Sequence, residues 1–185
     1  MVIDTCALCD ALCVVIAVRP SRTEDGCALR EIERAAGERF REVGLPDVAD
    51  DEPLSVEALA RYAMEGRSWV AVDDSGNPIG YVIVDVIDEN AHVEQVSVLP
   101  DHQGTGTGRA LFERVRAWAE VTERAAVTLT TFSDVPWNAP FYRHLGFRSL
   151  SDDELGPELR AVRDAETANG LDPGTRVCMR WEVVG

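Results

Sequence analysis

Hydrophobic residues along this chain follow two periods, and these periods divide it into helices and strands. A spacing of three or four residues predicts an amphipathic helix, whereas short apolar runs bounded by turn residues predict strands. Gly44, Gly66 and Gly146 mark helix ends, and Ser55 is a helix cap. The predicted helices cover 23–43, 56–65, 106–124, 140–145 and 154–168, and the predicted strands cover 14–18, 69–72, 79–87, 91–98, 126–131, 147–150 and 176–183.

The order of these elements indicates the fold class. Three strands in succession, from Trp69 to Val98, exclude a purely alternating doubly wound arrangement, so we expect a mixed α/β sheet with helices on its faces. A length of 185 residues favours a single domain that spans residues 1–185. We expect 1–12 to be an N-terminal extension and 151–185 to be a C-terminal helix–strand tail.

Charge and composition narrow the classes of partner. The net charge of −15 argues against nucleic acid and anionic membranes and mildly favours cationic partners. No apolar stretch reaches the length of about 20 residues that a spanning helix needs. The apolar start of the chain carries Asp4 and Asp10 and lacks a basic region, so we expect no signal peptide and a cytoplasmic location.

Two residue types exclude or limit particular chemistry. All 18 basic residues are arginine, so the chain has neither a Walker-type phosphate loop nor a Schiff-base lysine. Cys6, Cys9 and Cys13 form a cluster that could be read as a metal site or as reduced cysteines. A zinc site needs four ligands and this cluster supplies three, so we expect no metal site.

A glycine-rich stretch, VEQVSVLPDHQGTGTGRAL at 93–111, stands immediately before the third predicted helix. A helix N-terminus presents unpaired N–H groups and partial positive charge, and glycines let a phosphate approach the backbone closely. The three glycines alternate with two threonines that could add hydroxyl donors. The sequence therefore predicts a phosphate or pyrophosphate site here, the alternative being a plain tight turn.

The flanks of this loop carry a resemblance. Gln103, Gly106 and Gly108 form the pattern Q-x-x-G-x-G after VSVLP, and the later stretch APFYRHLGF begins at Ala139. Together they resemble the cofactor motif and the F-Y-x-x-x-G-F segment of the GCN5-related N-acetyltransferase (GNAT) superfamily. The resemblance covers roughly Val14 to Leu150. It implies a mostly antiparallel central sheet of about six to seven strands, helices on both faces, and acetyl-CoA as cosubstrate.

The strand before the loop changes phase. Ala91 and Val93 are apolar, but after Glu94 the apolar positions become Val96 and Val98, which predicts a β-bulge. The resemblance implies that a backbone amide at or next to Val96 holds the thioester carbonyl. It also implies that the backbone of the strand follows the pantetheine arm and that the loop cradles the pyrophosphate; these cofactor contacts are Val96, Ser97, Val98, Gln103, Gly104, Thr105, Gly106, Thr107, Gly108 and Arg109. For Arg109, an ion pair with Glu113 is the alternative.

Acetyl transfer to an amine needs a base, a site for the oxyanion and a proton for the departing thiolate. Glu94 and His92 are the candidate bases, with Glu94 slightly favoured, and either could instead be an ordinary polar residue on a wet strand face. The resemblance implies that Tyr142 is the acid, with packing as its alternative role. The family's usual asparagine position is occupied by Val135, so Asn138 is predicted as a cofactor contact that could instead face the acceptor.

These observations predict an acetyl-CoA-dependent N-acetyltransferase that moves the acetyl group directly to a primary amine of a small molecule or peptide. A catalytically silent acyl-CoA-binding regulatory module and a nucleotide binder remain the alternatives. The resemblance also makes a homodimer an expected assembly by analogy. The acceptor itself carries no recognisable motif.

Overall fold

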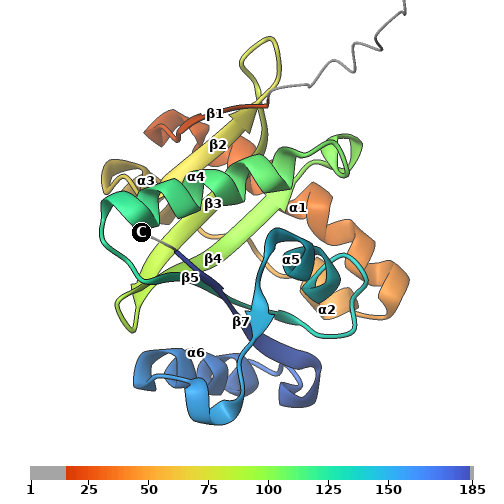
Figure 1. The fold of residues 1–185 in the computed structure, drawn as a ribbon. Coiled ribbons are helices and arrows are strands. Elements are labelled where there is room, and N and C mark those ends of the chain that lie inside the picture. Colours follow the sequence, from red (N-terminus) through yellow and green to blue (C-terminus); the bar gives the residue numbers. More distant parts are fainter. Residues whose placement is uncertain (1–15, 184–185) are drawn as a thin grey trace, which may run out of the picture.

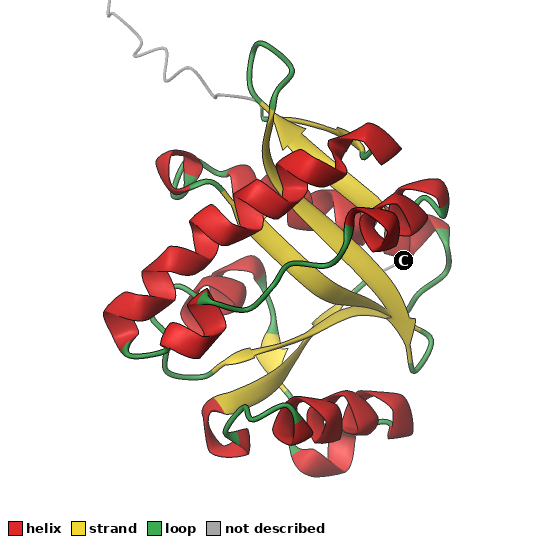
Figure 2. Cartoon of the chain, turned by 180° about the vertical axis from the view of Figure 1, so that it is seen from behind, coloured by secondary structure: helices red, strands yellow, loops and turns green. Residues whose placement is uncertain are grey.

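The computed structural model describes residues 16–183 (Figures 1 and 2). Its strands are β1 (Ala17–Pro20), β2 (Ser68–Val72), β3 (Pro78–Ile87), β4 (Asn90–Val98), β5 (Ala126–Phe132), β6 (Arg148–Ser149) and β7 (Arg176–Glu182). Its α-helices are α1 (Gly26–Gly37), α2 (Pro46–Ala49), α3 (Val56–Met64), α4 (Thr107–Val121), α5 (Ala139–Leu145) and α6 (Pro157–Ala168), and a 3₁₀ helix, η2 (Glu38–Val43), continues α1.

The seven strands form one sheet in the order β1-β2-β3-β4-β5-β7-β6. Among the described strands only β4 and β5 pair in parallel, which confirms the expected mixed, mostly antiparallel sheet. Strand β7 from the C-terminal tail pairs with β5 from Arg176 to Glu182 and lies between β5 and β6. The tail is therefore an integral part of the sheet.

Helices cover both faces of the sheet because alternate strand residues point to opposite sides. On one face, Trp69 and Val82 pack with Leu111 and Val115 of α4, and α5 joins this cluster (Figure 1). On the other face, seen from behind in Figure 2, α1 and α3 cover β2 and β3. The second cluster consists of Leu29, Ile32, Leu59, Val70, Tyr81 and Ile83.

Element boundaries differ from the sequence prediction at a few places. The first strand was predicted over 14–18, but β1 extends to Pro20, which pairs with Trp69; an edge strand tolerates this proline. The first long helix finishes as η2 and ends at Gly44, whose φ of 76° is left-handed. No element was predicted between the helices 23–43 and 56–65, but Pro46–Ala49 form the short helix α2, which buries Ala49.

Candidate active site

The centre of the sheet is split where β4 and β5 separate. These strands pair only from Ala91 to Val93 on β4 and from Val127 to Leu129 on β5. Beyond Val93 the two strands diverge, and a cavity of about 1280 Å³ opens between them. It reaches from the glycine loop past α1 to α6, so it joins the predicted cofactor residues to the first helices and the tail.

A register shift in β4 lies where the sequence alternation predicts a bulge. Ile83 of β3 pairs with Gln95, but the next residue, Val84, pairs with Val93. Glu94 is therefore left without an opposite residue on β3. The shift turns the strand at the point where the cavity begins.

The ladder geometry decides which backbone groups of β4 face this cavity. The N–H of Leu99 donates to the carbonyl of Ile79 at 2.9 Å, so these residues form a hydrogen-bonded pair. Because such pairs alternate along an antiparallel ladder, the pairs that Val96 and Val98 form with β3 are not hydrogen-bonded. The polar backbone groups of both valines thus point away from β3, toward the separated β5.

Two glutamine side chains contact these outward backbone groups. The N–H of Val96 donates to Oε1 of Gln95 at 3.0 Å. The Nε2 of Gln103 donates to the carbonyl of Val98 at 2.9 Å. A donor and an acceptor on the open side of β4 are what an extended chain containing carbonyl and amide groups needs, so the pantetheine arm fits this strand.

The glycine loop fits a diphosphate at its entrance. Gly104 and Gly106 have φ values of 74° and 96°, and Gly106 is the N-cap of α4 without a side-chain cap. A Cβ at either glycine would meet nothing within 4 Å, so the loop is open on its outer side. The first N–H groups of a 15-residue helix therefore remain accessible to an anion.

The other loop residues make contacts within the protein. Thr107 is 1% exposed and its hydroxyl lies 2.9 Å from that of Thr105, which in turn donates to the carbonyl of His102. A Cβ on Gly108 would lie 3.1 Å from the ring of Phe141, so this glycine provides room for packing. Arg109 donates to the carbonyl of His144 at 3.4 Å.

The alternative prediction for Arg109, an ion pair with Glu113, was wrong. Glu113 instead pairs with Arg116, one turn further along α4, at 3.2 Å. In the part of the chain that the structure describes, Arg109 makes no ion pair, so its charge is available near the loop.

Tyr142 lies on α5, beside the cavity, among aromatic rings. Its ring centroid is 5.5 Å from that of Phe112 and 5.9 Å from that of Phe147. Burial raises the pKa of Tyr142 to about 12, and nearby Arg176 and the Thr131 hydroxyl offset only part of this effect. The phenol is therefore protonated at neutral pH, and the raised pKa makes it a weaker acid than an ordinary tyrosine.

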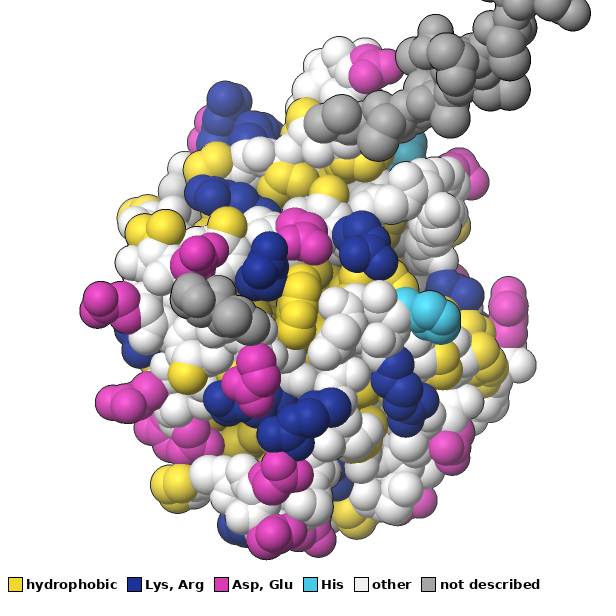
Figure 3. Space-filling model, viewed as in Figure 1, with side chains coloured by type: hydrophobic (Ala, Val, Ile, Leu, Met, Phe, Trp, Pro, Cys, Tyr) yellow, Lys and Arg dark blue, Asp and Glu magenta, His cyan; other side chains and the backbone are white. Residues whose placement is uncertain are grey.

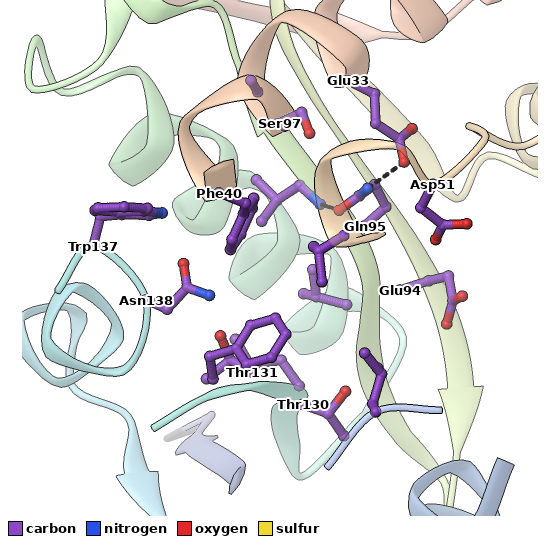
Figure 4. Close-up of a pocket in the computed structure, with 18 of the residues that line it drawn as sticks. Glu33, Phe40, Asp51, Glu94, Gln95, Ser97, Thr130, Thr131, Trp137 and Asn138 are labelled. Atoms are coloured by element: carbon purple, nitrogen blue, oxygen red, sulfur yellow. Dashed lines mark hydrogen bonds between the residues drawn. The ribbon is translucent and has the colours of Figure 1, made fainter. Parts of the chain in front are cut away.

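Asn138 and its neighbour Trp137 lie on the other side of the cavity from the carboxylates (Figure 4). Asn138 is the N-cap of α5, but its side chain makes no capping hydrogen bond. The guanidinium of Arg39, from η2, stacks 3.7 Å above the Trp137 ring and also donates to Gln103. Arg39, Trp137 and Gln103 all line the cavity.

The two candidate bases differ sharply in environment although both line the cavity. His92 is 2% exposed, its Nδ1 lies 3.0 Å from the Thr128 hydroxyl, and desolvation lowers its pKa to about 4. Glu94 reaches solvent in the cavity, yet the surrounding walls desolvate it, and Asp85, Glu166 and Glu33 add negative charge; together these raise the pKa of Glu94.

The cavity is acidic on the side away from the glycine loop. Its walls carry six carboxylates against three guanidinium groups, and Glu33, Asp51 and Glu94 lie together on one side (Figure 4). Helix α6 forms another wall, where Glu166 binds Arg176 and Thr130. By contrast, acidic and basic side chains are interspersed over the outer face in Figure 3.

Comparisons with known proteins decide the family. Residues 64–149 match the family model described as "Acetyltransferase (GNAT) domain". This match supports the GNAT superfamily. The match includes β4, the glycine loop, α4 and Tyr142, which are the elements of the site described above. Together with the relatives below, it bears out the predicted superfamily and acyltransferase class, with acetyl-CoA as the donor.

Individual relatives are distant. The chain is 24% identical over 143 residues to the peptidyl-lysine N-acetyltransferase YjaB of Escherichia coli K12, covering 77% of this chain and 88% of that protein. A GNAT acetyltransferase from Staphylococcus aureus superposes with a TM-score of 0.67 at 15% identity, covering 92% and 100%. Rv2747 from Mycobacterium tuberculosis, solved with CoA and NLQ, gives 0.64 at 19% identity, covering 91% and 99%.

Several residues of this GNAT site were not predicted from the sequence. They are Glu33, Arg39, Asp51, Gln95, Thr130, Glu166 and Arg176. They come from elements far apart in the chain, so spacing gives no signal for them.

Two further sequence predictions concern metals and membranes. Within residues 16–183 no group of three or more potential ligands could hold a metal ion. Cys6, Cys9 and Cys13 lie outside the described residues, whereas Cys27 is exposed and Cys178 is buried, both as free thiols. None of the described helices has the length and apolar character needed to cross a membrane.

Proposed function

We propose that this GNAT enzyme moves the acetyl group of acetyl-CoA directly to a primary amine of a small molecule or peptide that carries additional positive charge. The observation that carries the proposal is the open side of β4. There the outward backbone groups of Val96 and Val98 stand between the glycine loop at one end and the acidic cavity at the other.

The donor would lie along β4. The N-terminal amides of α4 receive the diphosphate, the backbone at Val98 contacts the pantetheine arm, and the N–H of Val96 receives the thioester carbonyl. This arrangement brings the acyl carbon to the split between β4 and β5. Asn138 remains a proposed contact from the opposite side of the cavity.

Glu94 is the base that we propose. It faces the cavity, and its raised pKa makes it a better proton acceptor than an ordinary carboxylate. It takes a proton from the acceptor ammonium, directly or through a water, and the neutral amine then attacks. His92 is the weaker candidate because burial holds it neutral and its Nδ1 is bound to Thr128.

Tyr142 is the acid that we propose for the departing thiolate. A phenol whose pKa is about 12 is protonated at neutral pH, so it can donate a hydrogen bond to the sulfur and pass on its proton as negative charge develops there. Transfer of this proton to the sulfur leaves the free thiol of CoA, and the Tyr142 phenolate regains a proton, directly or through solvent, from the nitrogen that becomes the amide. No cysteine of the described cavity lining is available for an acetyl-enzyme intermediate.

The acceptor class follows from the charge of the cavity. Glu94, Asp51 and Asp47 make no ion pair within the described part of the chain, so they are free to bind cationic groups. Relatives such as YjaB, named as a peptidyl-lysine N-acetyltransferase, support an amine acceptor in general terms. A polyamine, an aminoglycoside and a lysine-containing peptide share the required chemistry.

A panel of amines tests the proposal. Acetyl-CoA and the purified chain are incubated with polyamines, aminoglycosides, basic peptides and neutral amino acids, and free thiol release is measured. We expect turnover with cationic amines that falls sharply in Tyr142→Phe. Binding of acetyl-CoA without turnover on any amine would favour the silent regulatory module, and calorimetric binding of ATP or NAD in preference to CoA would favour a nucleotide binder.

A further inference from the structure

The side chain of Gln95 folds back onto the backbone of its own strand. Its Oε1 accepts the N–H of Val96 at 3.0 Å, and its Nε2 donates to Glu33 on α1 (Figure 4). The other carboxylate oxygen of Glu33 accepts the hydroxyl of Tyr81, a residue with 0% exposure. Gln95 is thus held at both ends, by a strand amide and by an anchored carboxylate.

The position of Gln95 coincides with the place of the reacting acyl group. Its Oε1 is a carbonyl oxygen bound to the Val96 N–H, which the proposed function assigns to the thioester carbonyl. A single N–H gives one well-aligned hydrogen bond, with a donor–hydrogen–acceptor angle above about 150°. The Gln95 carboxamide and an acyl carbonyl therefore compete for the same donor.

We propose that Gln95 is a built-in competitor for the acyl site and that Glu33 holds it there. This inference rests on the proposed function. Acetyl-CoA must displace the carboxamide, whereas free CoA, which ends in a thiol, has no carbonyl at this position and leaves the carboxamide in place. The device lowers the affinity for acetyl-CoA relative to CoA and covers the amide again once the acetyl group has left.

Gln103 provides a matched comparison within the same cavity. Its Nε2 donates to the carbonyl of Val98, a backbone group next to the pantetheine arm, which acetyl-CoA and CoA share. Truncation of Gln103 therefore acts on both ligands alike. Truncation of Gln95 acts only on the ligand that has an acyl carbonyl.

The experiment is calorimetric titration of the full chain with CoA and, separately, with acetyl-CoA. In Gln95→Ala we expect the Kd of acetyl-CoA to fall about two- to tenfold, the range that one net hydrogen bond supplies, while the Kd of CoA changes by less than twofold. Glu33→Gln keeps the shape but weakens the hold on Gln95, so a smaller decrease for acetyl-CoA is expected. Gln103→Ala should change both Kd values by the same factor.

Distinct outcomes overturn distinct claims. Equal changes for CoA and acetyl-CoA in Gln95→Ala, or weaker acetyl-CoA binding, would refute the competitor role and leave the proposed function intact. If the parent chain bound neither ligand, the proposed function and this inference would both fail. Glu33→Gln keeps the inference testable if Gln95→Ala does not fold, because an unchanged ratio of the two Kd values in Glu33→Gln would also refute it.

Discussion

The buried imidazole of His92 should make the fold sensitive to acid. Its pKa is about 4 in the folded chain and about 6.5 when unfolded, because burial penalises the charged ring. As the pH falls below 6.5, the unfolded chain binds this proton first, so folding stability decreases until the pH approaches 4. Between pH 7 and pH 4.5 the two pKa values give a loss of about 2–3 kcal/mol from this one group.

The variant His92→Asn isolates this contribution. An asparagine amide can keep a hydrogen bond to the Thr128 hydroxyl, but it does not titrate. Urea unfolding followed by tryptophan fluorescence would give the free energy of unfolding for parent and variant at both pH values. We expect the difference between them to shift by about 2–3 kcal/mol in favour of the variant at pH 4.5. A difference that stays constant with pH would show that His92 is not held neutral by burial.

Four further variants test the site and the fold. Tyr142→Phe should lower kcat about a hundredfold or more, as loss of an acid does, with little change in Tm because the ring packing is kept; an unchanged rate of thiol release would reject the acid role. Glu94→Gln should remove the acidic limb of the kcat/KM–pH profile, whose midpoint in the parent should lie above 4.5 because desolvation by the cavity walls and the nearby carboxylates raise the pKa of Glu94; a lower midpoint would contradict this assignment. Gly106→Ala should cost about 1–2 kcal/mol in urea unfolding, since its φ of 96° is left-handed, and should weaken CoA binding; full affinity would show that the loop does not hold the diphosphate. Ser55→Ala should lower the free energy of unfolding by about 1 kcal/mol because the Ser55 hydroxyl accepts the N–H of Ala58, while kcat stays the same. An unchanged free energy of unfolding would show that this cap does not stabilise the helix.

Local patterns were enough to predict most of the elements. The apolar spacing of α4 and the turn between β2 and β3 depend on neighbouring residues, so they could be read directly from the sequence. The start of α6 could not be read from neighbouring residues. Asp88, in the turn after β3, accepts the N–H groups of Glu158 and Leu159 and so fixes where this helix begins. Such a cap joins residues about 70 positions apart and leaves no local signal.

The site was predicted in part for the same reason. The loop glycines and Tyr142 belong to contiguous motifs, whereas the opposing wall is assembled from separate elements. His92 and Glu94 looked equivalent because they are two residues apart on one strand. Only the structure shows that Thr128 and the core surround the first, while the register shift leaves the second facing the cavity.

The divergence of β4 from β5 has a consequence for how this molecule can change. Under the proposed function, recognition of the donor at the split depends on peptide groups, which every amino acid except proline possesses in full. Substitutions at Val96 or Val98 can thus alter the width of the cavity without deleting the backbone groups that would form hydrogen bonds with acetyl-CoA. Under the proposed function, selectivity for the acceptor depends instead on side chains such as Asp51. Substitution of these side chains would admit new acceptors while the contacts to the thioester stay the same.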